Sequence, residues 1–406
     1  MVSTDAERPA KPRKLLAPRD LVVAQKNAVS TQIAEKIMKN GIVSIDGMAF
    51  PDSDPHRRIA PPRCKVTDPT FWDGYDSKTL FYMAIFNKNK QELTLFAPPL
   101  LNFHSIALSG RYSIDGVALS RPKYRKGYMF DRLIFRCKLA SKLLQVDIDG
   151  FSAGMPITET EPELFAGSKL VYTLSRNNEL TWVRDWLHWN HKVHGADAVL
   201  FVDNASTAYG TEELAATIAS VPGYRSALVV SVPFKFGPGI GTGFKSGDGN
   251  FLQTALMNAF WHRYMSTAKA MLNVDIDELM IAPNGLGIFD AVLTAPWGIV
   301  MASGTWRYAQ QTMSAYRHAD HFYKIENDIP CPPKYCVRPD SVAGRRILKL
   351  HAVKNFKRVP FVDRSTWYFL HCRNVSTSWK YDRNQIDTSI LVEDHDTRNT
   401  LLSVFG

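Results

Sequence analysis

The chain of 406 residues lacks the long apolar run of a membrane-spanning helix, because none of its hydrophobic stretches approaches the roughly 18 residues required. Its N-terminus also lacks the apolar core of a signal peptide, since the first ten residues are polar and include Asp5 and Glu7. From these two absences we expect a cytoplasmic protein.

Cysteine is scarce and does not occur in the clustered pairs of a zinc site. The chain has five cysteines, and Cys331 and Cys336 lack a second pair of Cys or His residues that would complete tetrahedral coordination. We therefore expect reduced thiols rather than disulfides or structural zinc.

The composition is not that of a disordered or fibrous protein, because 45% of the residues are hydrophobic and 22% are charged, and the length allows two hydrophobic cores. The net charge of +10 is unevenly placed: between residues 334 and 380, eleven Lys and Arg face only Asp340 and Asp363, a local balance of +9. Such a segment suits the phosphates of a nucleotide, a lipid-linked acceptor or an anionic membrane surface, and a solvated basic face explains any single residue equally well. Peripheral association with an anionic membrane is therefore one expectation, and a nucleic-acid partner is not expected.

The pattern of residues divides the chain into four parts. Residues 1–30 are rich in Pro, Lys and Arg and predict a flexible basic arm, whereas 31–150 contain short alternating apolar runs and predict a small β-rich domain. Residues 151–168, with two prolines and three glutamates, predict a linker. Residues 169–406 form the last part, in which strand and helix patterns alternate.

That alternation indicates the fold class. Apolar strand patterns at 170–174, 198–202 and 227–232 are separated by helical patterns, and a helix at 250–264 precedes a strand that ends at Asp275. This order predicts a doubly wound α/β domain. The glycine-dense stretch 237–249 predicts a mobile loop, with a lid over a nucleotide as the alternative.

Three acids follow that last strand, in the stretch 272–281. On an extended chain the i, i+2 spacing points the carboxylates of Asp275 and Asp277 to one side, and two such like charges require a cation or protons. Hard oxygen ligands at the carboxyl end of a strand suit Mg²⁺ or Mn²⁺ carrying a diphosphate, and the alternative is a solvated turn. A second Asp-x-Asp at 147–149 is followed by Gly150 and precedes every βα unit, so there we predict a strand ending in a turn.

Several short motifs occur in a characteristic order. They are Arg176-Asn177-Asn178-Glu179, Asp185-Trp186, His191 four residues before Gly195, Asp203-Asn204-x-Ser206, Gln253, Val274-Asp275-Ile276-Asp277-Glu278, Lys334-Tyr335-Cys336-Val337-Arg338-Pro339 and Phe369-Leu370-His371-Cys372-Arg373. With this order and spacing, residues 169–382 resemble family 92 glycosyltransferases and their family 2 relatives. The β-rich part upstream is similar in kind to the N-terminal domain of family 92. Leu279, Cys372 and Asp185 depart from the family's usual Phe, Tyr and Glu.

The resemblance implies a GT-A fold that transfers a sugar from a nucleotide-sugar donor to a glycan or lipid-linked acceptor, with Mn²⁺ or Mg²⁺ as cofactor and with inversion. It also implies that Asp275, Asp277 and a C-terminal histidine bind the metal, with His371 as the histidine and His351 as the alternative. The residues that it implies at the nucleotide-sugar are Arg176, Asn178, Glu179, Asp203, Asn204, Asp275 and Arg373.

The catalytic base stays open between three acids that follow the strand pattern at 298–303. Inverting transfer requires a carboxylate that takes the proton of the acceptor hydroxyl, and Asp320, Glu326 and Asp328 are candidates. Two other functions also stay open. A metal-dependent phosphotransferase or nuclease would use paired carboxylates and a basic flank, and a catalytically degenerate glycan-binding protein would keep metal binding without turnover.

Overall fold

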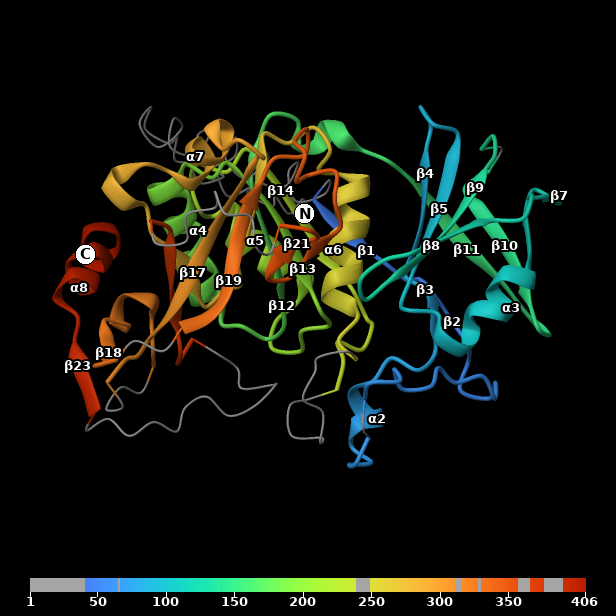
Figure 1. Ribbon diagram of the computed structural model, residues 1–406, viewed down its shortest axis with the longest axis horizontal. Helices are drawn as coiled ribbons and strands as arrows, with labels where there is room; N and C mark the ends of the chain where they lie inside the picture. Colours follow the sequence, from blue (N-terminus) through green and yellow to red (C-terminus); the bar gives the residue numbers. More distant parts are fainter. Residues whose placement is uncertain are drawn as a thin grey trace, which may run out of the picture.

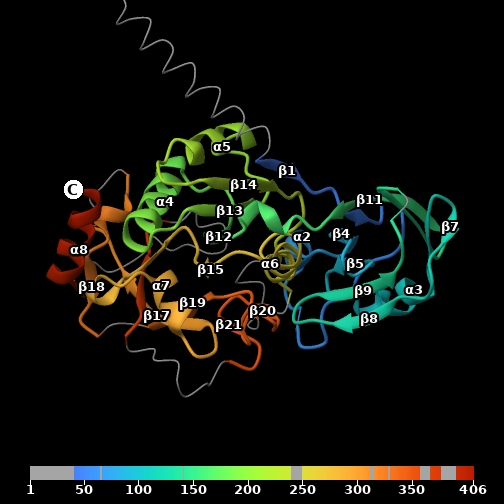
Figure 2. The same ribbon diagram turned by 90° about the horizontal axis from the view of Figure 1, so that it is seen from above.

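The computed structural model describes residues 41–64, 66–139, 141–238, 249–310, 315–327, 330–356, 366–375 and 390–406. The predicted arm at 1–30, most of the glycine-dense stretch and Asp328 lie outside the described residues. In the described part, two large sheets stand side by side with helix α6 (Leu252–Arg263) between them (Figure 1, Figure 2). No helix of this part combines the length and the apolar character needed to cross a membrane.

The smaller sheet has eight strands in the order β7-β6-β10-β11-β4-β5-β9-β8, and all its pairs are antiparallel except β11 with β4. These strands are β4 (Met83–Asn87), β5 (Glu92–Ala97), β6 (Arg111–Ile114), β7 (Val117–Ala118), β8 (Lys123–Lys126), β9 (Asp131–Arg136), β10 (Leu143–Ile148) and β11 (Phe151–Glu159). In β10 every second side chain, from Leu144 to Ile148, lies in the core. One face of the sheet is therefore packed, as the alternating pattern requires.

Strand β11 shows that the predicted linker at 151–168 is wrong in its first half. It lies in the middle of the sheet, and it pairs with β10 up to Pro156 and with β4 from Ile157 onward. Proline is tolerated at that position because one ladder of hydrogen bonds ends there and the other begins beyond it. Asp149 and Gly150, both with positive φ, form the turn between β10 and β11, which confirms the prediction for this Asp-x-Asp.

The larger sheet has nine strands in the order β1-β14-β13-β12-β15-β19-β17-β22-β16. They are β1 (Ile42–Ser44), β14 (Ser226–Ser231), β13 (Ala198–Asp203), β12 (Lys169–Ser175), β15 (Ala270–Asn273), β19 (Pro330–Val337), β17 (Ile299–Arg307), β22 (Tyr368–Cys372) and β16 (Glu278–Met280). The first five are parallel, and β14-β13-β12-β15 is the strand order of half of a doubly wound sheet. The α/β class is thus confirmed. Strand β1 departs from the predicted boundary, because it belongs to this sheet although it lies within 31–150.

Helices cover both faces of the larger sheet. Helices α4 (Leu180–His194) and α5 (Thr211–Ala219) lie on one face, and α6 lies on the other (Figure 2). Strand β12 accordingly contributes Leu170 and Tyr172 to the core shared with α6, and Val171 to the core shared with α4. Burial on both faces explains why these strands are continuous apolar runs in the sequence.

Candidate metal and nucleotide site

The carboxyl ends of β12, β13 and β15 meet at one edge of the larger sheet, because these strands are neighbours and parallel. Residues predicted at the nucleotide-sugar follow all three strands at that edge: Arg176, Asn178 and Glu179 after β12, Asp203 and Asn204 at the end of β13, and Asp275 after β15. The chain order reverses between β12 and β15, which is the position where open α/β sheets bind ligands. The fold therefore brings together residues that are about a hundred positions apart in the sequence.

The loops after β12 and β13 are joined by hydrogen bonds. The Ser206 hydroxyl donates to Asp203 Oδ1 at 2.5 Å and accepts the backbone N–H of Asn177 at 2.7 Å. Burial raises the pKa of Asp203, while the bonds from Ser206 and the charge of Arg176 act in the opposite direction. Asn178 donates to Ser175 Oγ at 2.8 Å, so these side chains form an ordered polar rim.

Asn204 and Glu179, which were also predicted to bind the nucleotide-sugar, have different surroundings at this rim. The Asn204 side chain is fully buried and donates to the carbonyls of Val232 and Phe234, at 3.2 and 2.8 Å, so it fastens the loop after β14. Glu179 is exposed and occupies the residue before the first turn of α4. The start of α4 therefore faces the same edge, where its free N–H groups favour an anion.

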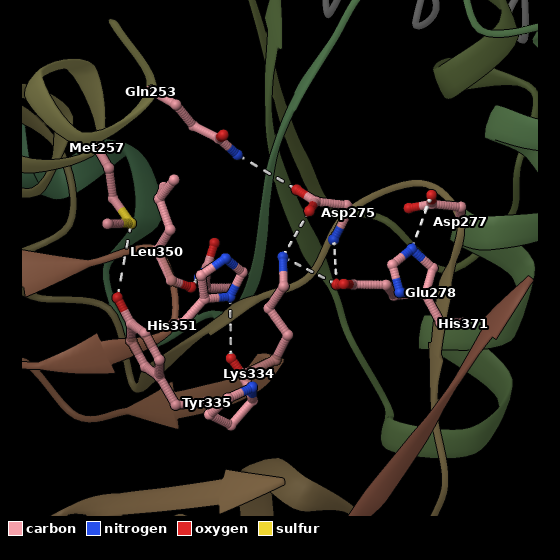
Figure 3. Close-up of polar contacts among 12 residues, drawn as sticks. Gln253, Met257, Asp275, Asp277, Glu278, Lys334, Tyr335, Leu350, His351 and His371 are labelled. Carbon is pink, nitrogen blue, oxygen red and sulfur yellow. Dashed lines mark hydrogen bonds and ion pairs between the residues drawn. The ribbon is translucent and has the colours of Figure 1, made fainter. Parts of the chain in front are cut away.

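Asp275 is paired with a buried lysine that the sequence did not single out as a site residue. Lys334 Nζ on β19 lies 2.6 Å from Asp275 Oδ2 and 2.9 Å from Glu278 Oε2 (Figure 3). Asp275 also accepts from Gln253 on α6 at 3.3 Å, and its backbone N–H donates to Glu278 Oε2 at 2.9 Å. The side chains of Lys334 and Glu278 are only 1% and 2% exposed, so their ion pair is internal, whereas the Asp275 side chain is 33% exposed.

The charges of this cluster depend on one another. Burial raises the pKa of Glu278 to about 7, although Lys334 opposes that shift. Burial alone would lower the pKa of Lys334, but the two adjacent carboxylates outweigh it and raise the pKa above its usual value. The two carboxylates thus favour the protonated, cationic form of Lys334.

Asp277 contacts a different partner, His371 on β22, whose Nε2 lies 3.0 Å from Asp277 Oδ2. Potential ligand atoms of Asp277, Glu278 and His371 all lie within 4.8 Å of one another. Two carboxylates and an imidazole at that spacing fit Mn²⁺ or Mg²⁺. This group, among the described residues, contains Glu278 in place of the predicted Asp275.

The difference has a local cause. The prediction assumed an extended chain, whereas residues 276–277 form a turn before β16, so the i, i+2 rule does not hold. Asp275 consequently contacts Lys334 and Gln253, and Asp277 contacts His371 (Figure 3). Strand β16 then pairs with β22 so that Glu278 lies directly opposite His371.

His371 is held by a stack of flat side chains. Its ring lies against that of Trp306 at the end of β17, with 3.9 Å between centroids and 17° between planes. The Arg373 guanidinium lies over the same indole, 5.2 Å from its centre. The alternative ligand His351 is exposed in the turn between β20 (Leu348–Lys349) and β21 (Ala352–Val353), contacts the Pro333 carbonyl at 3.2 Å and is not part of the group.

A buried network supports the turn that carries Asp277. His318 Nε2 donates to the carbonyl of Ile276 at 2.8 Å, and its Nδ1 lies 3.6 Å from Asp185 Oδ2. Arg317 binds Asp185 through both Nε and an Nη atom. Burial would raise the pKa of Asp185, but the nearby His318 ring and the bonds from Arg317 lower it overall. Asp185 belonged to a recognised motif, whereas nothing in the sequence marked His318.

The candidates for the base do not join the group. Asp320, in the 3-10 turn η4 (His318–Asp320), accepts the backbone N–H of Arg317 at 2.7 Å. It lines a cavity of about 560 Å³ bounded by α4 and α8 (His395–Phe405), which none of the potential metal ligands lines. Glu326 is exposed just after β18 (Tyr323–Ile325). The base is thus not assigned by the described residues.

Comparison with known proteins adds little to this geometry. No protein-family model matches the chain, and no curated protein matches it. A solved structure described as "Crystal Structure of a Mycobacterial Protein" aligns with 19% identity over 36% of this chain and 43% of that one, at a TM-score of 0.21. The chain thus spans less than half of that protein's length, and the likeness is too slight to define a fold.

Proposed function

We propose that the protein is a metal-dependent glycosyltransferase of the GT-A type, which moves a sugar from a nucleotide-sugar donor to a glycan or lipid-linked acceptor. The observation that carries the proposal is the group of Asp277, Glu278 and His371, in which Glu278 accepts a hydrogen bond from the backbone of Asp275, after the carboxyl end of β15. A site of this composition next to a switch point of an α/β sheet suits a metal-bound diphosphate.

Each part of the site has a distinct task in this proposal. Asp277, Glu278 and His371 would hold Mn²⁺ or Mg²⁺, which would offset the charge of the departing diphosphate. Lys334 keeps Asp275 and Glu278 in place, since it contacts both carboxylates. Asp203, Asn178 and Arg176 line the rim on the nucleoside side, and the N-terminus of α4 adds a positive field there.

The resemblance to family 92 supplies the inverting outcome in this proposal, with the base unassigned. A phosphotransferase working with two metals would need a second set of ligands. Among the described residues a single group of at least three His, Cys, Asp or Glu has the required spacing, which favours one-metal chemistry.

The test compares two Asp→Asn variants. Asp277→Asn should weaken Mn²⁺ binding, measured by titration calorimetry, and with it the Mn²⁺-dependent binding of a nucleoside diphosphate. Asp147→Asn removes a carboxylate from the other Asp-x-Asp, where it is bonded to Ser152 on the smaller sheet, and should change neither. Nucleotide binding that survives in Asp277→Asn and fails in Asp147→Asn would refute the site.

A second measurement addresses turnover. The protein with Mn²⁺ should hydrolyse at least one member of a nucleotide-sugar panel, and Asp277→Asn should abolish that activity. Metal and nucleotide binding without hydrolysis of any donor or transfer to any acceptor would indicate the degenerate glycan-binding protein instead.

A further inference from the structure

Two segments of the chain carry positive charge without any acid. Residues 116–130 contain four cations and no Asp or Glu, and residues 341–356 contain another four. The eight cations, named here the basic face, are Arg121, Lys123, Arg125, Lys126, Arg345, Arg346, Lys349 and Lys354. Seven are exposed and Lys349 is half-buried. Only the second segment belongs to the basic stretch recognised in the sequence.

The tertiary structure joins these segments. Lys349 on β20 places its ammonium group 4.1 Å from the centre of the Tyr128 ring, in the turn between β8 and β9. Figure 2 shows β8 and the β20–β21 hairpin on the same side of the molecule, the lower side of that view. The edge of the smaller sheet and the β20–β21 hairpin, which is a separate two-stranded sheet, thus form a continuous basic surface.

The basic face is also flanked by exposed apolar side chains. Trp297 is 39% exposed, Val342 43% and Tyr128 41%. Trp297 and Val342 are adjacent, because the backbone N–H of Ala343 donates to the Trp297 carbonyl at 3.2 Å. Arg345 and Arg346 follow directly in the chain, so cations and an exposed indole occupy one region.

Within the described residues, none of the eight cations forms an ion pair, and the nearby Asp340 is paired with Arg338 at 3.1 Å. Lysines on an edge strand such as β8 also deter edge-to-edge association. That role does not explain why the side chains of Trp297 and Val342 are exposed beside these cations, because neither residue lies on an edge strand. Cations beside exposed indole and aliphatic groups are the combination that binds the interface of an anionic bilayer.

We propose that the basic face binds the surface of an anionic lipid bilayer, with Trp297 and Val342 entering the headgroup region. The proposal does not rest on sugar transfer, because it uses no residue of the metal and nucleotide site. It predicts two separable contributions: a salt-sensitive attraction from the cations, and a salt-insensitive one from Trp297.

The test is co-sedimentation of the full chain with phosphatidylcholine vesicles, with and without phosphatidylserine. Wild-type protein should bind only the anionic vesicles, and the binding should fall at about 1 M salt, where the Debye length is about 3 Å. The double variants Arg125→Glu/Lys126→Glu and Arg345→Glu/Arg346→Glu should each bind roughly ten- to a hundredfold more weakly. Equal loss in both would show that the two segments act as one surface.

The matched control is Arg184→Glu/Lys192→Glu, which changes two exposed cations of α4, a helix on the upper side of Figure 2, opposite β8 and the β20–β21 hairpin. It makes the same change in net charge and should retain vesicle binding; a loss as large as that of the other two variants would overturn the proposal. Trp297→Ser should weaken binding to vesicles but not to heparin. Vesicle binding unaffected by Trp297→Ser, with heparin bound by the same cations, would identify a soluble polyanion as the partner and would also overturn it.

Discussion

Replacing Lys334 with methionine should destabilise the protein strongly, because this residue is the internal cation of the site. Lys334 and Glu278 expose only 1% and 2% of their side chains, and their charged atoms are 2.9 Å apart. Removing one member of such a pair costs about 3–5 kcal/mol, since the buried partner must then keep an unpaired charge or take up a proton. We expect a loss of that size in the free energy of unfolding, measured by urea denaturation monitored by tryptophan fluorescence.

The loss should depend on pH. Without Lys334 the pKa of Glu278, already raised by burial to about 7, should rise further. Its neutral form is then favoured in the folded state, whereas in the unfolded state it ionises near 4.5, the value of a free side chain. Folding of the variant therefore becomes less favourable as the pH rises above about 4.5. The difference in free energy of unfolding between the variant and wild type should be larger at pH 8 than at pH 6.

Two further variants make this reasoning falsifiable. Lys349→Met makes the same substitution at a half-buried surface position and should cost about 1 kcal/mol or less. The double variant Lys334→Met/Glu278→Gln should be less destabilised than the sum of its single variants, because it leaves no unpaired charge at position 278. A cost for Lys334→Met similar to that for Lys349→Met, or simple additivity in the double variant, would refute the role of Lys334.

Three further outcomes follow from the same structure. His194 uses both ring nitrogens in its neutral form, and burial lowers its pKa to about 4. The free energy of unfolding should therefore fall by roughly 3 kcal/mol from this residue as the pH drops from about 6.5 towards 4. The variant His194→Gln should show a flatter dependence of stability on pH. Trp306→Leu should weaken Mn²⁺ binding about tenfold because the indole ring orients His371, and Trp306→Phe should restore most of the affinity. Equal Mn²⁺ affinities of wild type and Trp306→Leu in titration calorimetry would argue against this role of the Trp306 ring. Arg373→Ala should weaken nucleoside-diphosphate binding at low and moderate salt alike, and a loss confined to low salt would place Arg373 on the surface instead.

The sequence by itself determined the α/β class and the strand ends at which several candidate site residues lie. The strands β12, β13 and β15 were recognisable because burial on both faces makes them continuous apolar runs. The resemblance implied that Arg176, Asp203 and Asp275 lie at one site, and the parallel pairing of these strands brings their carboxyl ends to one edge. The turn at Asp149 and Gly150 was also local information, since glycine and aspartate mark such turns.

Only the tertiary structure decided which carboxylates lie in the candidate metal-binding group and which cation pairs with them. The turn at Ile276 and Asp277 depends on β16 pairing with β22, a contact between segments about ninety residues apart, and that pairing puts Glu278 opposite His371. Lys334 reaches Asp275 because β19 lies antiparallel beside β15. Strand β11 was missed for a local reason, because its Gly154 and Pro156 are residue types that argue against a strand interior. The missed half of the basic face has the long-range cause, since a surface built from distant segments is set by packing over long sequence separations that local patterns do not record.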